Sequence, residues 1–211
     1  MSNWPERTLK LKASVGSGDL ATIYVASDVE RGQAEFAVAI LHYDLKDVEG
    51  VAAAMSKRIA ASKGVDHPGL VRCEGVFRVS DRPAVVMEMV DGKDLARLAK
   101  RRNTPAAIAA RIGLELTSFL VAAKAKGMVH GLLGPARVCI DNGGQVRVMG
   151  AVTPTGTMVD VDHPIYREER GTSRYAAPEL MGGLLTTPND VYAIGGILTL
   201  LISGRWPQRP A

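Results

Sequence analysis

Two short segments in the second half of the chain restrict its possible folds more than any other feature. The first runs Gly127-Met-Val-His-Gly-Leu-Leu-Gly-Pro-Ala-Arg-Val-Cys-Ile140, and the second runs Gly171-Thr-Ser-Arg-Tyr-Ala-Ala-Pro-Glu179. A long helical pattern precedes the first segment: Thr104 is a candidate N-cap, Pro105 suits the first turn, and Gly127 ends the helix. The stripe expected to be buried consists of Ile108, Ile112, Leu116, Phe119, Leu120 and Ala123. A glycine-rich loop with one histidine therefore follows a core helix directly.

The second segment resembles the end of the activation segment of protein kinases, where Gly-Thr-x-x-Tyr-x-Ala-Pro-Glu is usual. The first segment then lies where a kinase carries its catalytic loop, His-Arg-Asp-Leu-Lys-Pro-x-Asn. His130, Leu133 and Pro135 fit that pattern. The Arg, Asp, Lys and Asn positions hold Gly131, Leu132, Gly134 and Arg137. The resemblance extends over roughly residues 8–208, and the chain resembles bacterial Ser/Thr kinases with eukaryotic-like catalytic domains.

The resemblance implies a bilobal α+β fold in a single domain over residues 1–211. We expect a β-rich N-lobe with one helix at 8–88, a hinge at 89–94 and a mainly helical C-lobe at 95–211. A kinase domain continues with several helices after the position of Gly204-Arg-Trp-Pro207. A truncated C-lobe with a bare apolar flank is therefore expected, and such a flank suits an interface with a second copy or another protein.

Composition bounds the class of protein. A chain of 211 residues with 46% hydrophobic residues can bury one core or two small lobes. Its net charge of +4 comes from scattered residues, so we expect no nucleic-acid partner. Cys73 and Cys139 lack any CxxC or metal-ligand spacing and are expected to be buried, reduced thiols. The N-terminus has no apolar signal-peptide core, and the run Val191–Ile202 is too short to span a bilayer, so the prediction is a cytoplasmic protein without membrane contact.

Three kinase motifs of the N-lobe are recognisable but altered. The Gly-x-Gly-x-x-Gly hairpin retains Gly16 and Gly18, with Ala21 at the third glycine. The Val-Ala-Ile-Lys strand ends in Leu41, and leucine would fill the pocket floor with apolar surface instead of binding phosphate. The expected helix at 48–63 has Arg58 where a kinase carries the glutamate that pairs with the lysine. What remains is a vestigial nucleotide pocket formed by Gly16, Gly18, Ala39, Glu88 and Met89.

Phosphoryl transfer in a kinase needs a catalytic aspartate and two metal ligands. The positions that would supply them hold Leu132, Arg137 and Gly150. Together with Leu41 and Arg58, these changes predict a pseudokinase that is not an enzyme and that binds no metal and needs no cofactor. Arg137 could exclude MgATP by occupying the magnesium position.

Other positions match structural residues of the kinase motifs: His130 as a core residue, Glu179 of the Ala-Pro-Glu run, and Asp190, which would hold the loop backbone. Two functions from different classes then remain open. The first is a regulatory scaffold in signalling, with an active Ser/Thr kinase as partner or a second copy in a homodimer. The alternative is a nucleotide sensor that binds ATP or ADP without metal and without phosphotransfer. The least favoured hypothesis is an enzyme that uses the kinase fold for a different reaction.

Overall fold

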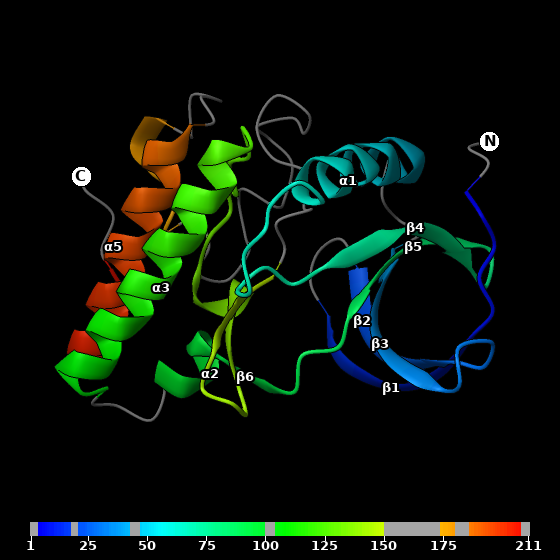
Figure 1. The fold of residues 1–211 in the computed structure, drawn as a ribbon, viewed down its shortest axis with the longest axis horizontal. Coiled ribbons are helices and arrows are strands. Elements are labelled where there is room, and N and C mark those ends of the chain that lie inside the picture. Colours follow the sequence, from blue (N-terminus) through cyan, green and yellow to red (C-terminus); the bar gives the residue numbers. More distant parts are fainter. Residues whose placement is uncertain are drawn as a thin grey trace.

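The computed structural model describes residues 4–17, 21–42, 47–99, 104–149, 174–179 and 186–207. Figure 1 shows two lobes side by side. The N-lobe is a curved sheet with a helix, α1 (Val48–Ser62), lying across one of its faces, and the C-lobe is mainly helical. The bilobal α+β class predicted from the sequence is confirmed.

The N-lobe sheet has five antiparallel strands in the order β1-β2-β3-β5-β4. Their bounds are β1 (Leu9–Ser17), β2 (Ala21–Asp28), β3 (Ala34–Leu41), β4 (Cys73–Val79) and β5 (Arg82–Glu88). Both faces of β3 are buried, because alternate residues enter two different apolar clusters. Val38 and Ile40 enter the outer cluster, whereas Ala39 and Leu41 enter the cluster beneath α1.

The helix α1 begins where the sequence predicted it. Its N-cap is Asp47, whose Oδ1 accepts a hydrogen bond from the Gly50 amide at 2.9 Å. Ala52, Met55 and Ile59 are buried against the sheet. The helix therefore forms one wall of the N-lobe core and runs toward the junction with the C-lobe (Figure 1).

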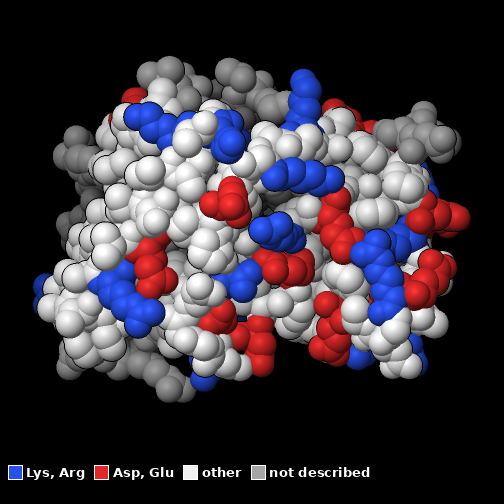
Figure 2. All heavy atoms as spheres, in the orientation of Figure 1, with Lys and Arg blue, Asp and Glu red and all other residues white. Residues whose placement is uncertain are grey.

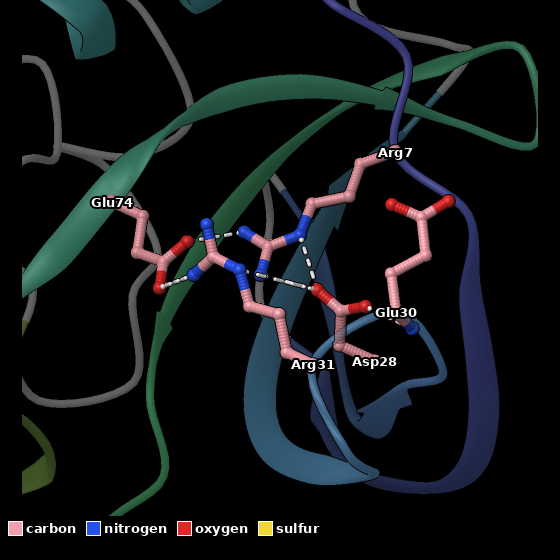
Figure 3. Close-up of polar contacts among 5 residues, drawn as sticks. All are labelled: Arg7, Asp28, Glu30, Arg31 and Glu74. Atoms are coloured by element: carbon pink, nitrogen blue, oxygen red, sulfur yellow. Dashed lines mark hydrogen bonds and ion pairs between the residues drawn. The ribbon is translucent and has the colours of Figure 1, made fainter.

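An ionic cluster fastens the N-terminal segment to this sheet. The Arg7 guanidinium lies between the rings of Phe36 and Phe77, at 4.8 and 5.0 Å from their centroids. It bonds Asp28 at 2.8 Å and also Glu74, and Arg31 reaches Glu74 at 2.9 Å (Figure 3). The Arg7 hydrogen bond holds the pKa of Asp28 below its usual value, against the effect of burial.

The described part of the C-lobe contains a small sheet and two long helices. The sheet has the order β6-β7-β8, with β6 (Gly92–Asp94), β7 (Val138–Asp141) and β8 (Val146–Val148). A short helix, α2 (Leu95–Ala99), follows β6, and a 3₁₀ turn, η1 (Pro135–Arg137), precedes β7. The helices α3 (Ala106–Ala125) and α5 (Thr187–Ser203) lie side by side, and Gly113 of α3 allows Leu198 to approach closely (Figure 1).

Two sequence expectations for α3 are wrong. Thr104 does not cap the helix: the N-cap position is Pro105, and no side chain bonds the first turn. Ile108 is 52% exposed, because it lies in the first turn and its side chain is not on the packed stripe that begins at Ala109. The other predicted stripe residues of α3 are buried.

By length and composition, α3 is apolar enough to cross a membrane, but one side of it forms part of the C-lobe core. The two cysteines are both free: Cys139 is buried and Cys73 is half-buried. On the face drawn in Figure 2, Lys and Arg alternate with Asp and Glu and form no broad patch of one sign.

Candidate functional site

The loop Val129–Leu132 lies at the junction of the lobes, and Asp190 of α5 holds its backbone. Both carboxylate oxygens of Asp190, in the first turn of α5, accept backbone hydrogen bonds, from His130 N and Gly131 N, each at 2.7 Å. Gly131 adopts a positive φ of 81°, a conformation that lets successive amides face one anion. The resemblance implied that Asp190 would hold the backbone of this loop, and the structure brings these residues together.

His130 is fully buried and is locked in one neutral tautomer. Its Nε2 lies 2.9 Å from Met149 O, and its Nδ1 accepts the Leu132 amide at 3.3 Å. A ring that donates from Nε2 and accepts at Nδ1 must be neutral. Burial lowers the pKa of His130 to about 3, so the ring stays uncharged across the physiological range.

Asp190 is also buried, and its charge is costly there. Burial raises the pKa of Asp190 to about 6, although the two backbone hydrogen bonds and the nearby Arg58 act in the opposite direction. The carboxylate is therefore ionised at neutral pH. An ionised carboxylate is the form that accepts both loop amides without competition from its own proton.

Leu132, at the position of the catalytic aspartate in the kinase motif, packs into the N-lobe. It is 3% exposed and belongs to the apolar cluster that contains Leu41 of β3 and Met55 of α1. Leu41, at the position of the motif lysine, has no exposed surface. The two replaced positions thus contribute to one apolar core that joins the loop of the C-lobe to the N-lobe.

Arg58 of α1 makes a polar contact across the same junction. Its Nη2 donates to Val129 O at 2.9 Å and to His130 O at 2.8 Å. The motif glutamate at this position would pair with a lysine on β3, but here β3 carries Leu41. The arginine instead turns toward the loop of the C-lobe.

The other predicted pocket residues are engaged in structural contacts or lie apart. Ala39 is buried in the cross-lobe cluster, and Glu88 accepts the Arg72 amide at 2.8 Å and pairs with Arg147. Gly16 lies in β1, where an added Cβ would meet nothing within 4 Å, and Met89 is 37% exposed. Gly18 and Gly150 are outside the described residues.

Arg137 lies beside the contacts of His130, and burial together with the positive charge of Arg137 lowers the pKa of that histidine, whereas Glu179 forms no hydrogen bond or ion pair with the described residues of the loop. Arg137 ends η1 and its carbonyl accepts the Met149 amide at 2.8 Å, while Glu179 is exposed. Within the described part of the chain, no group of three or more His, Cys, Asp or Glu side chains could hold a metal ion.

Sequence reasoning missed two features of the site. Apolar filling was predicted at Leu41 but not at Leu132, and Arg58 was predicted only to lack the charge of the motif glutamate. The sequence did contain a signal for the role of Leu132. Leu41 and Leu132 stand at two positions that carry charge in the kinase motif, and two leucines there are expected if both side chains share one core. No local signal indicated the partner of Arg58.

Comparison with known proteins identifies the domain family. The family model described as "Protein kinase domain" matches residues 9–210. The chain is 30% identical over 205 residues to CBL-interacting protein kinase 4 of Oryza sativa subsp. japonica, covering 94% of this chain and 45% of that protein. It is 28% identical to serine/threonine-protein kinase pkn2 of Myxococcus xanthus, covering 92% of this chain and 24% of that protein. It is 27% identical to serine/threonine-protein kinase PrkC of Bacillus subtilis, covering 92% of this chain and 30% of that protein. The chain thus spans less than half the length of each of these relatives.

These matches confirm the resemblance to protein kinases and correct one expectation. The replacement of the residues at five motif positions predicted a protein that is not an enzyme. The matched family and the relatives, which are named as protein kinases, point to an enzyme. The expectation of a non-enzyme is therefore wrong.

Proposed function

Since this chain belongs to the protein kinase domain family, we propose that it is a signalling domain that acts through protein contacts, as a regulatory scaffold for a Ser/Thr kinase or for a second copy of itself. Binding of this kind is compatible with phosphotransfer by the same domain. The localisation to the cytoplasm stays a prediction from the sequence.

The observation that carries this proposal is the apolar cluster shared by the two lobes. Leu132 from the C-lobe loop and Leu41 from β3 lie in one core together with residues of α1. A core that crosses the cleft restrains the lobes relative to each other. A domain held in one arrangement presents a pre-organised surface, and pre-organisation lowers the entropic cost of binding a protein partner.

The outer surfaces of the C-lobe helices support the choice of a protein partner. Large exposed apolar side chains occur on α3, at Leu114 (72% exposed) and Val121 (66%), and on α5, at Val191 and Ile202 (59% each). Apolar surface of this kind is what protein interfaces use when it is contiguous.

The test measures self-association and binding to an active kinase. Sedimentation velocity of the chain up to about 100 μM would detect a homodimer of even weak affinity. Biolayer interferometry with the kinase domain of the Bacillus subtilis relative would detect the second kind of partner. Phosphotransfer is measured in the same mixtures with MgATP, for this chain alone, for the relative alone and for both together.

A matched pair of variants locates the interface. We expect Leu114→Glu on α3 to weaken the interaction at least about tenfold, because a charge would enter an apolar contact. Val29→Glu changes a residue of similar exposure (62%) in the N-lobe turn after β2 and should have no effect. The proposal fails if the chain stays monomeric over this range and neither binds the relative nor changes its rate.

A further inference from the structure

Two charged residues, one from each lobe, form hydrogen bonds with the backbone of the loop Val129–Leu132 from opposite sides. Asp190 of α5 accepts the amides of His130 and Gly131, at 2.7 Å each. Arg58 of α1 donates to the carbonyls of Val129 and His130, at 2.9 and 2.8 Å. The three loop residues from Val129 to Gly131 are therefore held both from the C-lobe and from the N-lobe, and His130 is bonded by both.

These four hydrogen bonds belong to two consecutive peptide groups. The peptide that joins Val129 to His130 accepts from Arg58 through its C=O and donates to Asp190 through its N–H. The next peptide, which joins His130 to Gly131, does the same. The C=O and N–H of a trans peptide point in opposite directions. Each peptide group thus lies between a guanidinium and a carboxylate, with its dipole aligned to both.

We propose that Arg58 is the positioning residue that couples the lobes, through an ion pair with Asp190 that is relayed by these two peptide groups. Aligned hydrogen bonds polarise one another. The hydrogen bonds from the loop amides to Asp190 are therefore stronger when Arg58 donates to the carbonyls of the same peptide groups. The position that carries a lysine-paired glutamate in the kinase motif here carries a residue that bonds the loop instead.

An apolar contact also joins this loop to the N-lobe. Leu132 follows the two hydrogen-bonded peptide groups and is buried in the N-lobe cluster beneath α1. Arg58 and Ile59 are neighbours on α1, and Ile59 lies in that same cluster. A polar and an apolar contact therefore hold α1 to the loop at one place. Loss of Arg58 removes these two hydrogen bonds and leaves the apolar contact at this place, so the end of α1 gains freedom to move away from the loop. The lobes stay joined elsewhere, by the backbone hydrogen bonds of Val148 to Gly69 and Val71 and by the pair of Glu88 with Arg147.

The experiment compares Arg58→Gln with Lys57→Gln. Lys57 is the exposed neighbour on α1, so its variant removes one positive charge from the same helix without touching the loop. Amide exchange is followed by NMR in the intact chain. We expect exchange of the His130 and Gly131 amides to be at least about tenfold faster in Arg58→Gln, and unchanged in Lys57→Gln. Arg58→Lys, which keeps a cationic donor, should recover most of the protection.

Two additional readouts separate positioning from general stabilisation. The pKa of Asp190, followed by carboxyl NMR, should rise in Arg58→Gln, because the cation that favours its ionised form is gone. Spin labels at Val29→Cys and at Gln145→Cys, an exposed position in the turn between β7 and β8, report the distance between the lobes in a Cys73→Ser background. That distance distribution should broaden in Arg58→Gln and stay narrow in Lys57→Gln.

Three results would overturn the proposal: His130 and Gly131 exchange at the wild-type rate in Arg58→Gln, exchange accelerates uniformly over the domain, or the interlobe distance distribution is unchanged. These results are independent of whether the chain binds a kinase or itself, so the failure of one proposal is distinguishable from the failure of the other.

Discussion

His130 and Asp190 are neighbours in the site, and burial changes their pKa values in opposite directions. The pKa of His130 falls to about 3 and that of Asp190 rises to about 6. Both shifts disfavour charge in the folded state. Only Asp190 is charged at neutral pH, where the two loop amides and Arg58 compensate it.

The His130 shift predicts how stability depends on pH. The folded pKa of about 3 is below the ordinary value of 6.5, so the unfolded chain binds more protons between these values. The stability linked to neutral His130 is present above about pH 6.5 and is lost as the pH falls toward 3. Asp190 acts oppositely: its linked stability is present below 3.8 and is lost as the pH rises through about 6.

The variant His130→Gln isolates the histidine contribution, since glutamine does not titrate. The free energy of unfolding is measured by urea denaturation of both proteins from pH 7.5 to 4.5. We expect the advantage of the wild type over His130→Gln to be largest above pH 6.5 and to shrink by about 1.4 kcal/mol per pH unit below about pH 6. An advantage that stays constant with pH would show that His130 titrates normally in the folded protein.

At the scale of elements, α5 illustrates how adjacent glycines differ in role. Gly196 faces Tyr175, which is 1% exposed, and a Cβ at Gly196 would lie 2.7 Å from the Tyr175 ring. Gly195 is exposed, and a Cβ there would meet nothing within 4 Å. The absent side chain at Gly196 thus lets the segment that ends in Ala177-Pro-Glu179 dock on the helix.

Matched alanine variants test this difference. Gly195→Ala should stabilise the protein by up to about 1 kcal/mol, because alanine has the higher helix propensity. Gly196→Ala should destabilise it by about 1–3 kcal/mol, since overpacking against Tyr175 exceeds the same propensity gain. Thermal and urea unfolding of both variants provide the comparison. Equal effects of the two substitutions would contradict the close contact between Tyr175 and α5.

The elements themselves were largely predictable, for local reasons. The helix expected at 48–63 is α1 (Val48–Ser62), and its apolar spacing and cap suffice to place it. The turn between β7 and β8 is likewise local, because the Oδ1 of Asp141 accepts the amides of Gly143 and Gln145. Ile108 fits the helical period equally well but is exposed, because the period identifies a face and not the point at which packing begins.

At the scale of the whole molecule, the core that crosses the cleft makes Leu41 essential to the joint between the lobes. Leu41 is fully buried in the cluster that includes Leu132. Lysine at this position would restore the kinase motif but would place an ammonium among apolar side chains. The motif glutamate that would pair with it is Arg58 here, which adds a second positive charge on the facing helix.

We therefore expect Leu41→Lys to lower the free energy of unfolding by about 3 kcal/mol or more, as an unpaired buried charge does. Leu41→Met, which conserves volume, should cost less than about 1.5 kcal/mol. Urea denaturation at pH 7 measures both. A Leu41→Lys protein as stable as the wild type would mean that the side chain reaches solvent and that the cleft is open.

The sequence by itself determined the family frame, the order of helices and strands, and the residues that stand at each motif position. These depend on local patterns: motif spacing, alternation in strands and helical periodicity. The tertiary structure alone decided what the replaced residues do. Arg58 bonds carbonyls that are 71 and 72 residues away in the chain, and Leu132 enters a core built by strands of the other lobe. Such contacts follow from how the lobes meet, and no local pattern in the chain encodes that.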